Sequence, residues 1–177
     1  MTHITTYMGE DFYPLAPVAS LIHLEDIAHA LSLTCRANGH FIRFYSVAQH
    51  SINCANEAKA QGLELKIQLA CLLHDASEAY LSDIPRPVKH QLPEYIAAEQ
   101  QLQSMIYNKF LGSDLSEEET ETVRQIDQNM LVGEFAALMK KKVFDESPNF
   151  ISKPNFDFCE PVKVEFEFIE LFQKLYR

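Results

Sequence analysis

Apolar residues recur at steps of three and four along most of this sequence, and this period constrains the fold more than any other feature. In the first such segment, residues 23–36, the apolar positions are Leu24, Ile27, Ala28, Leu31 and Cys35. The period predicts a helix there, because such positions form one face of a helix. It predicts four more helices, over residues 46–60, 65–81, 94–110 and 116–139. We therefore expect an all-α protein whose helices share one apolar core.

Local signals mark the ends of these segments. Pro85 and Pro87 cannot continue the helix predicted over residues 65–81. Ser116 and Glu119 have the spacing of a capping box, which predicts the start of the fifth helix. The inward face of that fifth helix carries Asp127 among its apolar positions, which are Val123, Ile126, Met130 and Leu131.

The last third of the chain has a weaker pattern. Residues 141–160 contain two prolines and several phenylalanines without a steady period, which predicts an irregular connector that packs in part. A C-terminal helix is predicted after Pro161. With 177 residues and 47% apolar content, the chain suits a single domain over residues 1–177, with a core of about five helices over residues 23–140.

Charge and composition exclude several functions. The chain has 15 basic and 25 acidic residues and a net charge of −10, which is unsuited to binding a nucleic-acid polymer. No apolar run approaches 18 residues, and the first residues lack a basic stretch followed by an apolar one, so we expect a soluble cytoplasmic protein without a membrane partner. The four cysteines lack CxxC spacing and are expected to be reduced.

The stretch LACLLHDASEAYLSDIP, from Leu69 to Pro85, places His74 and Asp75 directly after its most apolar run. In a continuous helix Glu78 would share a face with both, being three or four residues further on. His50 and Asp127 lie on the inward faces of two other predicted helices. If these faces meet, four nitrogen and oxygen ligands, His50, His74, Asp75 and Asp127, converge on one point and suit a divalent metal.

The alternative is that each of these groups is a hydrogen-bonded residue of the core, and for any single histidine or aspartate this is the more frequent case. Three helices that each turn an ionisable group inward would be a costly arrangement without a cation to neutralise the carboxylates. The sequence therefore favours a metal centre over a purely structural cluster.

The pattern formed by SVAQHS around His50, LLHDASEAYLSDIP around His74 and Asp75, and the later Asp127 resembles the HD-domain metal-dependent phosphohydrolases. It is most similar to the branch with bacterial 5′-deoxynucleotidases and their short phage-associated relatives. The resemblance covers residues 27–139 and implies an HD-domain helical bundle around one divalent metal ion (Co, Mn, Ni, Fe, Zn or Mg). It also implies a homodimer and a small phosphorylated substrate, namely a nucleotide.

The same resemblance implies roles for particular residues. Glu78 and Asp75 are expected to be catalytic, with Glu78 handling a proton for the attacking water or the leaving sugar oxygen. Arg36 matches an arginine that orients the phosphate. The residues expected to contact the substrate are Arg36, Arg43, Asp83, Ile84, Pro85 and Arg86. An exposed cation without a substrate contact is an equally good interpretation of Arg43.

Two positions depart from the family pattern. The 5′-deoxynucleotidases carry tryptophan directly after the phosphate-orienting arginine, whereas this chain has Ala37, so selection for deoxyribose does not carry over. Arg86 stands where those enzymes have a small hydroxyl residue. Two other classes of function remain open: a non-catalytic regulator that binds metal or nucleotide, and a helical interaction protein with a structural His-Asp cluster. Retention of Glu78 favours the enzyme, because binding alone needs no proton-transfer group.

Overall fold

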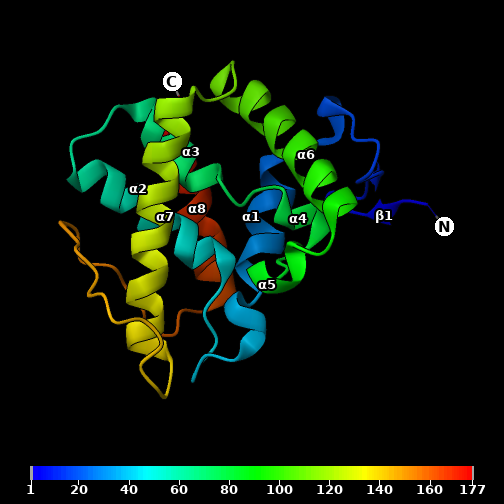
Figure 1. The fold of residues 1–177 in the computed structure, drawn as a ribbon. Helices are drawn as coiled ribbons and strands as arrows, with labels where there is room; N and C mark the ends of the chain where they lie inside the picture. Colours follow the sequence, from blue (N-terminus) through cyan, green and yellow to red (C-terminus); the bar gives the residue numbers. More distant parts are fainter. Residues whose placement is uncertain (1, 177) are drawn as a thin grey trace.

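Helices build almost the whole protein, and the computed structural model describes residues 2–176 (Figure 1). The α-helices are α1 (Leu24–Leu33), α2 (Val47–Ala60), α3 (Leu65–Leu73), α4 (Glu78–Leu81), α5 (Arg86–Lys89), α6 (Pro93–Leu111), α7 (Glu117–Leu138) and α8 (Pro161–Leu175). An antiparallel pair of short strands, β1 (Ile4–Thr5) and β2 (Asp11–Phe12), precedes them. Two 3-10 turns lie at Ala19–Leu21 and Arg36–Gly39. The all-α prediction is confirmed.

The core forms where α2 and α3 pack together and α8 closes over them (Figure 1). Helix α8 contacts α1, α2 and α3, while α7 crosses α2 and α3 from the other side. Each fully buried large apolar side chain contributes roughly 1.5–3 kcal/mol. The fully buried side chains at this centre include Ile27, Leu31, Leu72, Leu73, Ile106, Met130 and Phe168.

Four of the predicted helices are found within about two residues of their expected bounds: α2, α6, α7 and α8. The capping box of α7 is confirmed, because Ser116 Oγ accepts from the Glu119 N–H and the Glu119 carboxylate accepts from the Ser116 N–H. Helix α6 ends where Gly112 takes the left-handed backbone conformation, at φ 80°.

The first helix is shorter than predicted. It ends at Leu33, because residues 34–36 leave the helix and pair with residues 45–47 as extended chain: the Arg36 N–H donates to Tyr45 O, and the Val47 N–H donates to Thr34 O. Arg36 then begins a 3-10 turn in which Ala37 and Asn38 have left-handed backbone angles. This turn carries Arg36 away from α1.

The hairpin β1–β2 and helix α5 were not predicted. Helix α5 begins at Arg86, directly after Pro85, and Pro87 is its second residue. Proline is tolerated in the first turn of a helix, because the N–H groups of that turn have no partner within the helix. The two prolines therefore end one helix and allow a short new one.

The connector between α7 and α8 has no helix or strand among its described residues, as predicted. The buried Glu57 of α2 holds it: the Glu57 carboxylate accepts from the N–H of Ile151 at 3.0 Å and from that of Ser152 at 2.9 Å. On α7, Gly133 leaves room for the ring of Phe150, which a Cβ at that position would meet. No helix within residues 2–176 has the length and apolar character needed to cross a bilayer.

Candidate metal centre

Four predicted ligands meet at the centre of the bundle. His50 comes from α2, His74 and Asp75 follow α3, and Asp127 comes from α7. The His50 Nε2 atom lies 3.1 Å from His74 Nε2, 3.1 Å from Asp127 Oδ1 and 3.7 Å from Asp75 Oδ2. His74 Nε2 lies 3.4 Å from Asp75 Oδ2 and 3.8 Å from Asp127 Oδ1. Ligands bound at about 2.0–2.2 Å to one ion are separated by roughly 3.0–3.6 Å, so this donor set fits a single divalent metal.

The backbone between residues 73 and 78 differs from the continuous helix that the sequence predicted over residues 65–81. Helix α3 ends at Leu73, and a tight turn follows in which Ala76 N–H donates to Leu73 O and Glu78 N–H donates to Asp75 O. These bonds span three residues instead of four, so the chain is wound more tightly. His74 and Asp75 therefore converge on one point, whereas in a regular helix they would splay apart.

Gln103 of α6 stabilises this turn. Its side-chain N–H donates to Leu73 O at 2.8 Å, and its side-chain oxygen accepts from the Ser77 N–H at 3.1 Å. The Ser77 N–H thereby gains an acceptor, and Leu73 O accepts a second hydrogen bond besides the one from Ala76.

The Nδ1 atom of each imidazole already has a hydrogen-bond partner. His74 Nδ1 lies 2.8 Å from the Cys71 carbonyl oxygen, and His50 Nδ1 lies 2.6 Å from Glu134 Oε1. Both partners are acceptors, so each neutral ring carries its proton on Nδ1 and presents a lone pair at Nε2. The two lone pairs face one another across 3.1 Å. A cation between them removes the repulsion, and metal-bound histidines have this arrangement.

The electrostatics of the cluster favour positive charge at its centre. Burial and Arg36 act to lower the pKa of His50, yet Cys54, Glu134 and Asp127 raise it well above its ordinary value. Burial acts to raise the pKa of Asp127, but the imidazoles of His50 and His74 beside it hold it well below its ordinary range. The carboxylate is therefore ionised, as a metal ligand must be.

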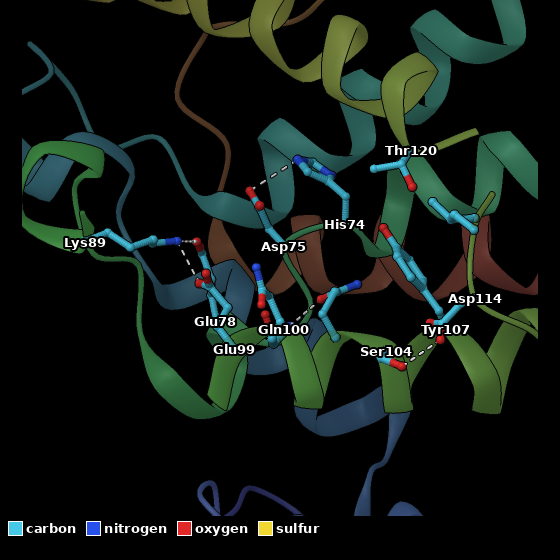
Figure 2. Close-up of a pocket in the computed structure, with 13 residues that line it drawn as sticks. His74, Asp75, Glu78, Lys89, Glu99, Gln100, Ser104, Tyr107, Asp114 and Thr120 are labelled. Atoms are coloured by element: carbon cyan, nitrogen blue, oxygen red, sulfur yellow. Dashed lines mark hydrogen bonds and ion pairs between the residues drawn. The ribbon is translucent and has the colours of Figure 1, made fainter. Parts of the chain in front are cut away.

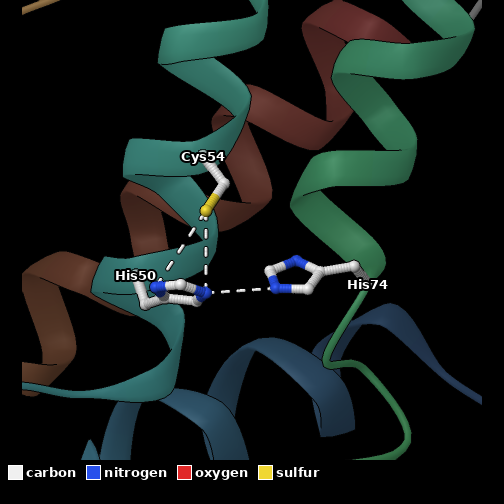
Figure 3. Close-up of side chains that lie close together, drawn as sticks. All are labelled: His50, Cys54 and His74. Carbon is white, nitrogen blue, oxygen red and sulfur yellow. Dashed lines mark hydrogen bonds between the residues drawn. The ribbon is translucent and has the colours of Figure 1, made fainter. Parts of the chain in front are cut away.

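Cys54 is a fifth possible donor, and the sequence reasoning missed it. The donor atoms of His50, Cys54 and His74 lie within 4.8 Å of one another (Figure 3). Cys54 Sγ lies 3.6 Å from Nε2 and 4.0 Å from Nδ1 of His50. Figure 3 shows the sulfur over the face of the ring, away from the direction of the Nε2 lone pair toward His74. His50, Cys54 and His74 thus form an alternative set of metal donors. Its geometry is less suitable than that of the set with two carboxylates, because the sulfur does not face the Nε2 lone pair of His50.

A buried ion-pair network supports the cluster. Arg36 Nη1 donates to Asp75 Oδ2 at 3.1 Å, and Arg36 Nη2 donates to Glu134 Oε2 at 3.2 Å. Burial acts to raise the pKa of Glu134, but His50 and Arg36 lower it. Glu134 is therefore an ionised carboxylate between two positively charged or polarised partners.

A cavity of about 460 Å³ opens beside the cluster. Five of the six predicted substrate-contacting residues line it, namely Arg36, Asp83, Ile84, Pro85 and Arg86. Arg43 does not: it is partly exposed and pairs with Asp157 at 2.7 Å. The structure thus brings Arg36 and the loop of residues 83–86 to one cavity. Arg43 lies elsewhere, because the residues that follow the 3-10 turn lead it outward to the connector.

A second cavity of about 390 Å³ also reaches Asp75 and Glu78 (Figure 2). Most of the residues that line it are polar, and its four carboxyl groups outnumber its one lysine. Glu78, Lys89 and Glu99 gather at one end, while Tyr107 and Asp114 lie at the other (Figure 2). The two cavities share Asp75, Glu78 and Lys89.

Glu78 is buried between the two cavities. Its Oε2 atom has no hydrogen-bond partner among the described residues, and its Oε1 atom lies 3.8 Å from Lys89 Nζ. Burial raises the pKa of Glu78 well above its ordinary value, and the neighbouring Asp75 and Asp83 raise it further. A carboxyl group with a raised pKa keeps its proton to a higher pH than an ordinary glutamate and can act as a proton donor.

Comparison with known proteins finds two uncharacterized relatives and one relative that is named as an enzyme. No protein-family model matches the sequence. The chain is 39% identical over 110 residues to YfdR, an uncharacterized protein of Escherichia coli, which covers 62% of this chain and 59% of that protein. It is 36% identical over 102 residues to an uncharacterized protein of Rhodobacter capsulatus, covering 54% of this chain and 52% of that one.

The third relative carries a function in its name. This chain is similar to a 5′-deoxynucleotidase. The similarity, to the enzyme of Vibrio vulnificus, is 30% identity over 109 residues, covering 46% of this chain and 56% of that enzyme. The chain thus spans between 52% and 59% of the length of these three relatives.

Several residues of the site were not predicted. Glu134 follows Asp127 by two helical turns, so the helical period held a signal for it. Cys54 likewise follows His50 by one turn. Phe135 lies one helical turn after Leu131 on α7, so the period also held a signal for it, whereas Lys89, Phe41 and Phe144 carried none because their place at the site depends on how the segments between the long helices fold. All three phenylalanines line the first cavity.

Proposed function

We propose that this protein is a metal-dependent phosphohydrolase that removes phosphate from nucleoside 5′-monophosphates. One observation carries the proposal: two buried imidazoles turn their Nε2 lone pairs toward one another and toward two carboxylates. Such a set of nitrogen and oxygen donors is suited to a divalent cation. The similarity to a 5′-deoxynucleotidase supports the choice of reaction.

The proposed ligands are His50, His74, Asp75 and Asp127, and the identity of the metal is open among Co, Mn, Ni, Fe, Zn and Mg. When bound, the metal supplies Lewis acidity that lowers the pKa of water and offsets charge on a phosphoryl oxygen. The protein fixes the donors in advance, because Glu134 and the Cys71 carbonyl hold the two rings in the required tautomer.

The charges around the first cavity favour a monophosphate. Its wall carries three cations, Arg36, Arg86 and Lys89, against four carboxyl groups, Asp75, Glu78, Asp83 and Asp127. A divalent metal changes this balance to one positive charge, and protonation of Glu78 changes it to two. A phosphomonoester dianion would then be neutralised, whereas a triphosphate would leave excess negative charge in a poorly solvated site.

The outer part of the cavity suits a planar, largely apolar group. Phe41, Phe135 and Phe144 lie on its wall, together with Pro85 and Pro87. Aromatic faces stack on any nucleobase, so little preference among the bases is expected. Ala37 also lines the cavity and is small. We therefore expect both ribonucleotides and deoxyribonucleotides to be accepted.

Glu78 is the proposed proton donor to the leaving sugar oxygen. It lines the same cavity as Arg36, and burial, Asp75 and Asp83 raise its pKa and so favour its protonated form. Arg36 lies against Asp75, where it can bind the phosphate and orient it for in-line attack. Positioning and proton transfer are thus assigned to residues on opposite sides of Asp75.

The experiment is an assay of phosphate release from ribo- and deoxyribonucleoside 5′-monophosphates. Protein stripped with a chelator is tested with and without each candidate metal. The expected result is no release from stripped protein, and release that one or more metals restore. His74→Ala is expected to abolish the restored activity. His90→Ala is the matched control, because His90 is an exposed histidine outside the cluster.

The non-catalytic regulator is the second candidate function. It predicts that the protein binds a divalent metal and a nucleoside monophosphate without releasing phosphate under any of these conditions. Glu78 favours the enzyme over this regulator, because its Oε2 atom has no hydrogen-bond partner among the described residues and its pKa is raised.

A further inference from the structure

Glu134 joins the two halves of the proposed active site. It lies on α7, is fully buried, and has both carboxylate oxygens occupied by residues from other segments. Its Oε1 atom lies 2.6 Å from His50 Nδ1, and its Oε2 atom accepts from Arg36 Nη2 at 3.2 Å. One side chain therefore contacts a proposed metal ligand and the proposed phosphate-binding arginine at the same time.

Toward His50, the carboxylate fixes both the tautomer and the orientation of the ring. By accepting the Nδ1 proton, it keeps the lone pair on Nε2, which faces His74 and Asp127. A partner of this kind on a metal-bound histidine is worth 10–100-fold in metal affinity.

Toward Arg36, the same carboxylate sets the plane of the guanidinium. Arg36 uses one terminal nitrogen for Glu134 and the other for Asp75 Oδ2. The side chain is only 11% exposed, so few other arrangements are open to it. The guanidinium is thereby held at the wall of the first cavity. On one side lies Asp75, a proposed metal ligand, and on the other lies Glu134, which orients His50.

These contacts form a closed set: Glu134 to His50, His50 to Asp75 through the cluster, Asp75 to Arg36, and Arg36 back to Glu134. A cation at the cluster draws Asp75 and His50 toward itself. A phosphate on Arg36 draws the guanidinium toward the cavity. Because one buried carboxylate orients both groups, ordering one of them lowers the cost of ordering the other.

We propose that Glu134 is a positioning residue that couples metal binding to phosphate binding, so that each ligand strengthens the affinity for the other. The inference rests on the proposed function, because it needs a metal at the cluster and a phosphate at Arg36. By linkage, the factor by which phosphate strengthens metal binding equals the factor by which metal strengthens phosphate binding.

The test uses the full chain, Mn²⁺ and inorganic phosphate. The dissociation constant of Mn²⁺ is measured with and without phosphate, at concentrations that keep both in solution. For the unaltered protein we expect phosphate to tighten Mn²⁺ binding at least about fivefold, the lower end of typical couplings. In Glu134→Gln we expect Mn²⁺ alone to bind about 10–100-fold more weakly and the effect of phosphate to vanish.

Two further variants keep the test decisive. Arg36→Lys retains the charge but cannot bridge Glu134 and Asp75, so it should keep Mn²⁺ affinity within a few-fold and lose the effect of phosphate. Glu57→Gln is the matched control, because Glu57 is also a fully buried, hydrogen-bonded glutamate on a helix, but it lies two turns after His50 and its carboxylate binds the connector instead of the cluster. It should lose stability and keep the full coupling.

The outcomes separate the inference from the function beneath it. Coupling that persists in Glu134→Gln, or an unaltered protein in which phosphate leaves Mn²⁺ affinity unchanged, overturns the inference. In either case, metal-dependent release of phosphate from nucleoside monophosphates would leave the proposed function standing. An unaltered protein that binds no divalent metal overturns both.

Discussion

The Nε2 atoms of His50 and His74 lie 3.1 Å apart, and the Nδ1 atom of each ring already faces an oxygen acceptor. If both rings were neutral, their Nε2 lone pairs would face and repel each other. Without a metal, the arrangement is relieved only if one ring takes a second proton, which is consistent with the raised pKa of both histidines. A metal in that place displaces the proton, so metal binding should release protons and weaken as the pH falls.

The first prediction concerns the ligands. His74→Ala and Asp127→Ala should each lose metal, with affinity falling more than about 100-fold, since removing a ligand costs more than removing a group that merely orients one. Metal content after dialysis, measured by elemental analysis against the His90→Ala control, checks this. An Asp127→Ala protein that keeps its full metal content would show that Asp127 is not a ligand.

The second prediction distinguishes the two possible donor sets. Burial raises the pKa of the Cys54 thiol to about 11, and its sulfur lies over the face of the His50 ring. Cys54→Ser should therefore bind metal within about tenfold of the unaltered protein, well short of the loss expected for a ligand. If Cys54→Ser loses metal while Asp127→Ala retains it, the donors are instead His50, Cys54 and His74.

The third prediction concerns Glu78. Glu78→Gln should retain the metal and lower kcat by about 10²–10⁴-fold, the usual contribution of a general acid. The raised pKa of Glu78 gives the direction of the pH effect: activity should fall as the pH rises through that pKa, because the proton to be donated is lost. The pH profile of kcat tests this. A Glu78→Gln protein that keeps the same alkaline decline would assign the decline to another group.

Local signals accounted for most of the fold prediction. Helices α2, α6, α7 and α8 have a steady apolar period together with a cap, a glycine or a proline at one end. Each of these features acts over a few residues, so one sequence suffices to detect it. The same period placed His50 and Asp127 on inward faces, and the structure brings both to the cluster.

The structure departs from the sequence-based expectations where distant residues decide the course of the chain. The break after Leu73 is stabilised by Gln103, thirty residues further on, and no local signal in the apolar run indicates it. The position of Arg36 depends on the pairing of residues 34–36 with residues 45–47. Arg43 is drawn outward by Asp157, which lies in the irregular connector. Each of these contacts joins residues that are distant in the sequence, so no local pattern predicts it.

The last prediction tests how the connector is fastened to the core. Burial acts to raise the pKa of Glu57, but hydrogen bonds from Gln61, Ser152 and two backbone N–H groups outweigh it and lower the pKa below its ordinary value. A carboxyl whose pKa is lowered on folding stabilises the native state above its unfolded pKa, about 4.3. That stabilisation is lost as the pH falls through the folded pKa.

Glu57→Gln should accordingly lower the free energy of unfolding by about 1–3 kcal/mol at pH 7, because buried donors lose an ionised acceptor. The difference from the unaltered protein should shrink as the pH falls below the unfolded pKa of about 4.3 and on through the lower pKa of the native carboxyl. Urea unfolding at the two pH values measures it, and Glu118→Gln, on the exposed side of α7, is the control. A difference that stays equal at both pH values would show that the shape of the side chain, and not its charge, holds the connector.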